Sequence, residues 1–286
     1  MTRQRRRRGR RSRLLWKLLL LCALCAGFFW WSNYSLQTET FTFSSSRLPQ
    51  GFDGCVIVQL SDLHGALFGE DNRALLDRVR SAAPDYIFLT GDLQDQYRQT
   101  PRSYSVSLGR SLAEIAPTYF ITGNHEWAFS DVPGLKRELE AAGVTVLSNE
   151  YTVLERGGST LVLAGIDDPN GYADQKTPEA LAAEVEAAFD DPFWLLLAHR
   201  NNYFEKEYSL LGADLVITGH GHGGLIRLPF TDGLISVERS FFPSYTAGFY
   251  SANGGEVLVS RGLGNSGRTF RLFNRPEVVV LRLERG

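Results

Sequence analysis

The chain has 286 residues, 43% of them apolar and 22% charged, so it can bury a sizeable core as one large domain or two small ones. The net charge of −2 hides a split, because eight arginines and no acidic residue lie in residues 1–13, and Lys17 follows. Setting these nine of the 30 basic residues aside leaves 21 against 32 acidic residues. That acidic balance argues against long polyanions, so no nucleic acid is expected as a partner.

An apolar run from Leu14 to Trp31 follows the arginines and is interrupted only by Lys17. Its 18 residues are just enough to span a bilayer. The arginines should stay in the cytoplasm while the rest is exported. A cleaved secretory signal is the alternative, but no good A-x-A site follows, and neither Cys22 nor Cys25 has the small preceding residue of a lipoprotein site. We therefore expect a basic cytoplasmic segment at 1–13, an uncleaved transmembrane signal anchor at 14–31 and an extracytoplasmic domain.

Residues 32–54 are rich in Ser and Thr, which is typical of a tether leading into the domain or of a first edge strand. The domain proper is expected at 55–286. Its first half alternates apolar strand-like runs with helical periods, in the order CVIVQLSD, EDNRALLDRVRSAAP, YIFLTGD, a helix between Arg102 and Ala116, and TYFITGN. This alternation indicates an α/β domain with parallel strands that are covered on both faces.

The second half continues with elements of both kinds. A helix is expected at 132–142, a hairpin turn at Gly157-Gly158, and a helix capped by Thr177 that runs to Phe189. The later strand-like stretches are FWLLLAH, ADLVITGH, a hairpin in FYSANGGEVLVSR and the closing EVVVLRLE. No internal repeat is present.

Polar residues stand at the ends of the strand-like runs. They are Asp62, Asp92, Asn124, His199 and His220. In open α/β sheets ligands bind at the carboxyl ends of strands, so these side chains should converge on one cleft.

Two further histidines accompany this set, since His64 follows Asp62 by two residues and His222 follows His220 by two. That spacing puts both side chains of each pair on one side of an extended loop. With His125, the cleft accounts for all five histidines of the chain. A lone histidine is more often structural, but that reading does not account for five at one edge.

Imidazole, carboxylate and amide ligands together suit divalent ions such as Mn, Fe or Zn. Seven ligands are too many for one tetrahedral ion, whereas a bridging carboxylate gives each of two ions four protein ligands. The sequence therefore predicts two transition-metal ions.

Five short motifs carry a resemblance to a known family. SDLH, GDLQD, GNHE, LAH and GHGH occur in this order between about Val56 and Leu283. Together they resemble the motifs of the calcineurin-like metallophosphoesterases. GHGHGG followed by RLP, AGIDDP, and RGLGNSG with RLFNRPE look like the bacterial, membrane-anchored branch. The resemblance implies a four-layer α/β/β/α sandwich with two mixed central sheets, here preceded by one transmembrane helix.

The resemblance also implies roles for the residues. Asp62, His64, Asp92 and His222 would hold one metal ion, and Asp92, Asn124, His199 and His220 the other. Asp92 would bridge the two ions, and His125 would be the general acid for the leaving group. A hydroxide that bridges the ions would attack the phosphorus.

Some positions near the motifs are less clear. Asp95 and Glu126 match acidic positions that would orient ligand imidazoles, or they are solvated surface acids. After His199 the family often has Pro-Asp, but this chain has Arg200–Asn202, so we expect a loop of a different shape. Gly221 stands where a threonine is common.

Two other motif matches lack the neighbouring residues or elements that their function requires. Gly262, Gly264 and Gly267 match a dinucleotide fingerprint, but a strand-like tail follows in place of a helix. His125-Glu126 begins like a zinc-protease motif, but Phe129 takes the second histidine's place. Cys55 is interpreted as a small buried apolar residue.

The leading hypothesis is a metal-dependent phosphoester hydrolase, acting as a phosphatase, phosphodiesterase or pyrophosphatase. An outward-facing, tethered domain favours an envelope or lipid-linked phosphate as substrate. The alternatives are an extracytoplasmic nucleotidase or nuclease, and a catalytically silent, membrane-tethered metal-binding module.

Overall fold

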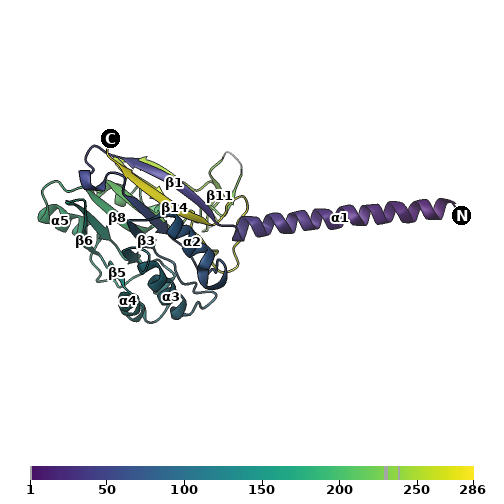
Figure 1. Cartoon of the computed structure of the whole chain (residues 1–286), viewed down its shortest axis with the longest axis horizontal. Coiled ribbons are helices and arrows are strands. Elements are labelled where there is room, and N and C mark those ends of the chain that lie inside the picture. The colour runs from purple at the N-terminus through teal and green to yellow at the C-terminus, as the bar shows by residue number, and fades with distance from the viewer. Residues whose placement is uncertain (1, 229–230, 238) are drawn as a thin grey trace.

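The computed structural model describes residues 2–228, 231–237 and 239–286, and only the backbone of residues 2–12. Met1, the first residue of the predicted basic segment, lies outside the described residues. The chain forms an α/β body from which one long amino-terminal helix projects (Figure 1).

The first six-stranded sheet has the order β1-β14-β2-β3-β4-β5. Its strands are β1 (Gln37–Ser44), β2 (Val56–Leu60), β3 (Tyr86–Thr90), β4 (Thr118–Ile121), β5 (Val144–Val146) and β14 (Glu277–Glu284). Strands β2 to β5 run parallel, while the closing strand β14 pairs antiparallel with β2 and parallel with β1. Segment 32–54 therefore supplies the edge strand β1.

The second six-stranded sheet has the order β12-β13-β9-β8-β7-β6. Its strands are β6 (Glu150–Arg156), β7 (Ser159–Gly165), β8 (Trp194–Arg200), β9 (Leu215–Gly219), β12 (Gly248–Ala252) and β13 (Gly255–Val259). Strands β7, β8, β9 and β13 run parallel, and an antiparallel hairpin closes each edge. A two-stranded sheet of β10 (Ile226–Arg227) and β11 (Gly233–Ile235) lies outside both large sheets.

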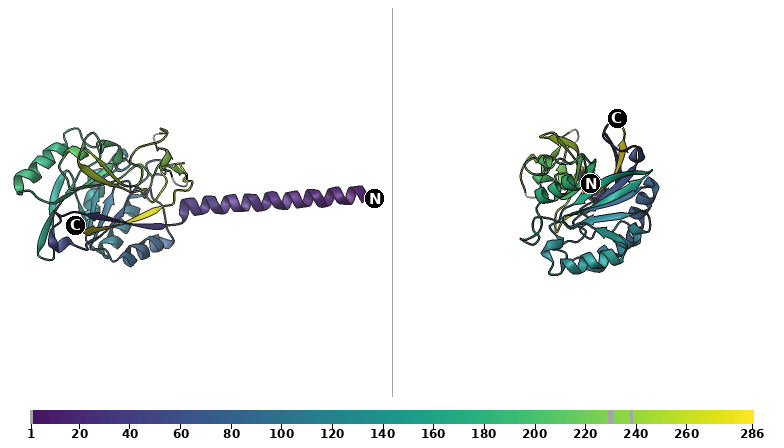
Figure 2. Two further views of the ribbon diagram at one scale, coloured as in Figure 1. Left: turned by 90° about the horizontal axis from the view of Figure 1, so that it is seen from above. Right: turned by 90° about the vertical axis from the view of Figure 1, so that its left-hand side faces the viewer.

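Helices cover the outer face of each large sheet (Figures 1 and 2). They are α2 (Arg73–Ala82), α3 (Arg102–Ala113) and α4 (Val132–Ala141) on the first sheet, and α5 (Pro178–Ala188) on the second. Short 3-10 helices lie at Gln50–Phe52, Glu70–Asn72, Glu126–Ala128, Asn201–Tyr203 and Tyr208–Leu210. The four layers are those that the sequence predicted.

Three apolar cores separate the four layers. Strand β2 shows how they arise, because Val58 packs under the helices while its neighbour Ile57 packs between the two sheets. Both faces of β2 are covered, so all five of its residues are buried. This explains the continuous apolar run, which lacks the alternation of a half-exposed strand.

The other predicted elements agree with the structure. The Thr177 side chain caps α5 by accepting from the N–H of Ala180. Gly157 and Gly158 form the turn between β6 and β7, both with positive φ. A loop and then β14 follow Gly262, so the dinucleotide reading is excluded here.

Helix α1 (Thr2–Tyr34) projects from the body. Within it, Arg13–Tyr34 has a mean hydropathy of 1.9 over its 18-residue window, and none of that window is buried. By length and composition this helix fits a membrane span or a signal sequence.

Candidate metal centre

The predicted metal ligands follow the carboxyl ends of strands, and five of them have left-handed backbone. These are Asp62, His64, Asp92, His220 and His222, with φ between 48° and 65°. For a residue with a side chain, this conformation costs roughly 1 kcal/mol or more. Such strain persists where the surroundings hold it in place, and it gathers at functional sites.

Two glycines make these turns possible. Gly91 precedes Asp92 with φ 89°, and a Cβ there would lie 2.6 Å from the Gly123 nitrogen. A Cβ on Gly219, before His220, would collide with the Ser61 hydroxyl. The glycines of the GD and GH motifs are thus required by close approach of neighbouring strand ends.

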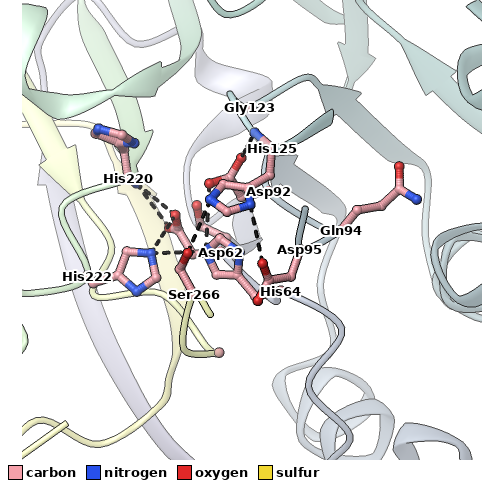
Figure 3. A network of polar contacts seen from close by, with 12 residues as sticks. Asp62, His64, Asp92, Gln94, Asp95, Gly123, His125, His220, His222 and Ser266 are labelled. Carbon is pink, nitrogen blue, oxygen red and sulfur yellow. Dashed lines mark hydrogen bonds and ion pairs between the residues drawn. The ribbon is translucent and has the colours of Figure 1, made fainter. Parts of the chain in front are cut away.

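Among the described residues, the strand ends bring buried ligand atoms together in three groups (Figure 3). Asp62, His64 and His222 form the first cluster and Asp92, His199 and His220 the second, each with its ligand atoms within 4.8 Å of one another. His64 also forms such a group with Asp95 and His125. In the first cluster, His222 Nε2 lies 3.0 Å from His64 Nε2 and 3.4 Å from Asp62 Oδ1. These rings therefore point at one another, as ligands of a common ion would.

Asp92 lies between the two clusters. Its Oδ2 is 3.6 Å from His64 Nε2 in the first cluster and 3.3 Å from His199 Nε2 in the second. His220 Nδ1 is 3.2 Å from His199 Nε2 and completes the second cluster. Among the ligand atoms that the structure describes, the Asp92 carboxylate thus lies near nitrogen atoms of both clusters.

Asn124 supplies an independent test of whether a metal fits. Its Oδ1 is buried, and no hydrogen-bond partner for it exists among the described residues. An unpaired buried carbonyl oxygen is costly unless a group that is not part of the chain satisfies it. A divalent cation does so, and the mixed donors around it suit a transition metal.

The ligand histidines His64 and His199 differ in their surroundings and therefore in the direction of their pKa shifts. Burial lowers the pKa of His64 to about 4, which keeps that ring neutral and its nitrogen lone pair available. His199 Nδ1 donates to the Thr90 carbonyl at 2.7 Å, so its Nε2 faces Asp92. Burial opposes a charge on His199, but Asp92 outweighs it and raises the pKa to about 10. A cation next to Asp92 would take the place of that proton.

His125 lies beside the clusters with a defined tautomer. The backbone N–H of Gln96 donates to its Nδ1 at 3.1 Å, which leaves the proton of a neutral ring on Nε2. That nitrogen lies 3.2 Å from the Ser266 hydroxyl, on the wall of the cleft. The ring therefore presents a proton donor to the cleft.

The two acidic positions beside these motifs act on the backbone. Glu126 is buried and accepts the N–H groups of Asp92, Gln94 and Gly123. Asp95 accepts the N–H groups of Tyr97 and Gly267, and it lies 3.6 Å from His125 Nδ1, too far for a hydrogen bond. Both carboxylates are buried, so the alternative that they are solvated surface acids is wrong, while their role in orienting ligand imidazoles stays a prediction.

A cleft of about 900 Å³ opens over the clusters. Three arginines line it, Arg98, Arg239 and Arg268, and the sequence reasoning gave none of them a role. It also missed Ser266 and the fully buried Arg271, which donates to the His222 carbonyl at 3.3 Å. Three of these five residues could have been found from the sequence. The family-like stretch RGLGNSG contains Ser266 and is followed by Arg268, and RLFNRPE begins with Arg271.

Gly221 and Asn201, which both depart from the family pattern, lie side by side in the structure. A Cβ on Gly221 would lie 2.5 Å from Asn201 Nδ2, which donates to the Tyr245 carbonyl. The Asn201 side chain therefore takes the space that a threonine at position 221 would need. Arg200, before it, forms a bidentate ion pair with buried Asp168 at 2.8 and 3.1 Å.

Two mixed sheets, outer helices and buried His/Asp metal-binding groups at the strand ends define the metallophosphoesterase class of α/β enzymes. Residues 55–224 match the family model described as calcineurin-like phosphoesterase, and the chain belongs to that family.

Relatives support the assignment. An uncharacterized metallophosphoesterase of Bacillus subtilis, YkuE, is 31% identical over 264 residues, which cover 88% of this chain and 86% of that protein. A Bos taurus transmembrane protein with metallophosphoesterase domain is 30% identical over 83% of this chain and 55% of its own length. The structure of Thermus thermophilus sulfate thiohydrolase SoxB has the same fold, with a TM-score of 0.51 and 12% identity over 82% of this chain and 57% of its own.

Proposed function

We propose that the site holds two divalent transition-metal ions, Mn, Fe or Zn. One ion would be held by Asp62, His64, Asp92 and His222, and the other by Asp92, Asn124, His199 and His220. The position of Asp92 between both clusters is the observation that carries this proposal. The unpaired Asn124 Oδ1 supports it. Bound there, the ions supply Lewis acidity and an activated water.

The proposed reaction is hydrolysis of a phosphoester bond. His125 donates the Nε2 proton to the leaving oxygen, and the Gln96 N–H holds the ring in the tautomer that can do so. The arginines at the cleft bind the remaining anionic oxygens. The chain's own residues thus provide the proton and the orientation.

The proposed substrate is an envelope or lipid-linked phosphate. Its support is α1, which fits a membrane span, together with the charge split between residues 1–13 and the rest. In this proposal 1–13 is cytoplasmic, 14–31 is an uncleaved single-pass signal anchor in the cell membrane, 32–54 leads into the domain, and 55–286 is extracytoplasmic. Protease added to intact protoplasts should then digest the domain, and protection until lysis would contradict the topology.

A nucleotidase or nuclease is the second candidate. Tyr97 lines the cleft with 70% of its surface exposed and could stack on a base. A catalytically silent metal-binding module is less well supported, because a structural metal site has no use for the proton donor His125.

One panel tests these proposals with the full chain in detergent. Metal content is measured beside hydrolysis of nitrophenyl phosphate, bis(nitrophenyl) phosphate, a nucleoside monophosphate and phosphatidic acid. We expect two ions per chain and turnover of an aryl ester. Two bound ions without turnover of any ester would support the silent module, and a single ion would refute the dinuclear site.

A further inference from the structure

The loop 265–275 connects the domain end of α1 with the catalytic cleft. Phe273 packs on Phe28 with ring centroids 4.7 Å apart, and Phe270 on Phe29 at 5.9 Å. Phe270 and Phe273 nevertheless remain 44% and 46% exposed. Both loop rings are thus level with helix residues that belong to the apolar run.

The depth of these rings follows from helix geometry. Phe28 and Phe29 lie three and two residues before Trp31, the end of the proposed signal anchor. At about 1.5 Å per residue this is roughly 4 Å along the axis. A bilayer that surrounds α1 up to Trp31 would therefore also reach Phe270 and Phe273, in its interfacial region.

The same loop forms a wall of the cleft. Residues Ser266–Thr269 line it, and the Ser266 hydroxyl lies 3.2 Å from His125 Nε2. The loop is fixed to the helix, because Asn33 Oδ1 accepts the Arg271 N–H at 2.8 Å and Asn33 Nδ2 donates to the Arg271 carbonyl at 3.0 Å. Phe270 lies four positions after Ser266, the residue beside the proton donor His125, which is at most about 14 Å of chain.

A second exposed aromatic pair lies on a segment that backbone bridges connect to this loop through β10 and β11. Phe241 and Phe242 are 70% and 76% exposed. Phe241 forms a bridge with Ile235 of β11, and Ile226 of β10 forms one with Leu272 in the loop. Figure 1 shows β11 beside the domain end of α1. We call Phe241, Phe242, Phe270 and Phe273 the docking face.

The charges around the docking face suit an anionic surface. Arg98, Arg239 and Arg268 are exposed where they line the cleft. Basic side chains beside a membrane attract anionic lipid headgroups. Exposed aromatic rings next to an apolar helix and a basic rim form the usual chemistry of a membrane contact.

We infer that the docking face inserts into the bilayer that holds α1, and that the cleft takes amphiphilic phosphoesters whose apolar part stays in that bilayer. The substrate part rests on the proposed phosphoesterase function, and the docking part rests only on the proposed membrane anchor. This arrangement brings the phosphate of a membrane lipid to the two ligand clusters while the lipid's tail stays in the membrane.

Spin labels test the docking part. The full chain with Cys22→Ala and Cys25→Ala is reconstituted into phosphatidylcholine and phosphatidylglycerol vesicles and labelled at Phe273→Cys, Phe241→Cys or Leu210→Cys. Leu210 is a matched control, since it is 65% exposed and lies near the amino end of β9. Labels at 273 and 241 should collide with dissolved oxygen more than with a water-soluble nickel complex, and the label at 210 should do the reverse.

Label results of other kinds would overturn the docking. Equal water accessibility at 273, 241 and 210 would place the face in solvent. Dipolar broadening between labels at 241, with both reagents excluded, would identify a second copy of the chain as the occupant.

Activity tests the substrate part. Phe241→Ser/Phe242→Ser should lower the rate on phosphatidic acid in vesicles about tenfold, because two inserted rings are lost. The rate on soluble nitrophenyl phosphate should stay within about twofold, as for other surface changes. Leu210→Ser should change neither rate.

The two readouts separate the two hypotheses. A chain that hydrolyses nitrophenyl phosphate but neither phosphatidic acid nor phosphatidylglycerol would overturn the amphiphile inference and leave the phosphoesterase intact. A chain with inserted labels that hydrolyses nothing would refute the proposed function and keep the docking.

Discussion

The two ends of the parallel strands differ in how many charged groups they bury and in what those groups face. At the carboxyl ends, charged groups such as Asp62, Asp92 and Arg271 are buried, and ligand residues have left-handed backbone. At the amino ends, charges are paired at the surface, as in Arg47 with Asp191, 44% and 86% exposed. Such surface pairs contribute at most about 1 kcal/mol each.

The difference teaches where this molecule tolerates strain. Clustered buried charges destabilise a fold unless the surroundings hold them, so the cluster of buried His and Asp side chains marks the functional end. The amino ends also have left-handed residues, such as Ala83 and Asp191, but no such cluster is found there among the described residues. Substitutions at the two ends should therefore separate loss of chemistry from loss of folding.

The largest effect is expected for Asp92→Ala. Because Asp92 reaches both clusters, its loss should release both ions and lower phosphoesterase activity by more than about 10³-fold. Elemental analysis of the purified chain measures the metal. Asp85→Ala, at the amino end of β3, is the control and should keep both ions. Two ions retained in Asp92→Ala would refute the bridging assignment.

His125→Ala should keep both ions but lose about 10² to 10⁴-fold of the rate on esters with poor leaving groups. An activated nitrophenyl ester should be spared in part, because nitrophenolate leaves without a proton. Rates on alkyl and aryl phosphates, with metal content in parallel, check this. Equal loss on both substrates with both ions bound would remove His125 from the acid role.

Gly221→Thr should destabilise the fold by roughly 1 to 3 kcal/mol, because its Cβ overlaps the Asn201 side chain. Adding Asn201→Gly should recover part of that loss in a double-mutant cycle measured by denaturant unfolding. Gly254→Ala, in the turn after β12, is the contrast. It has open space but φ 84°, so its cost is conformational and Asn201→Gly should not relieve it. Additive effects at 221 and 201 would contradict the coupling.

The smallest effect concerns Cys55, at the amino end of β2. Burial, aided by Asp85, raises the pKa of its thiol to about 12, so almost no thiolate exists at pH 8. In a Cys22→Ala/Cys25→Ala chain, iodoacetamide should modify Cys55 only after denaturation. Rapid modification of the native chain would show that this end opens locally.

The strand ends were predictable from the sequence for a physical reason. Strands covered on both faces are mostly apolar, so charged or ionisable residues just after them stand out, as Asp62 after β2 and His220 after β9 do. The glycines before Asp92 and His220 belong to the same signal. The fold class and the set of candidate ligands therefore followed from local pattern and motif order.

Other residues could not be found in this way. Ser266, Arg268 and Arg271 lie in a loop without periodicity, and only the folded chain brings that loop against His125, His222 and the end of α1. The backbone contacts of Glu126 and Asp95 were not predicted, because an acidic residue in a sequence does not show which N–H groups will face it.

By itself, the sequence determined the α/β class, the candidate ligands and the apolar amino-terminal helix, because apolar runs, strand periodicity and turn chemistry are local properties of the chain, whereas the four layers were implied by the family resemblance. Only the tertiary structure decided that Asp92 lies between two clusters, that Asn201 fills the space beside Gly221, and that Phe270 and Phe273 lie level with the apolar helix. These relations join residues that are from about 20 to about 245 positions apart, and distances between such residues are fixed only when the sheets close and the side chains pack.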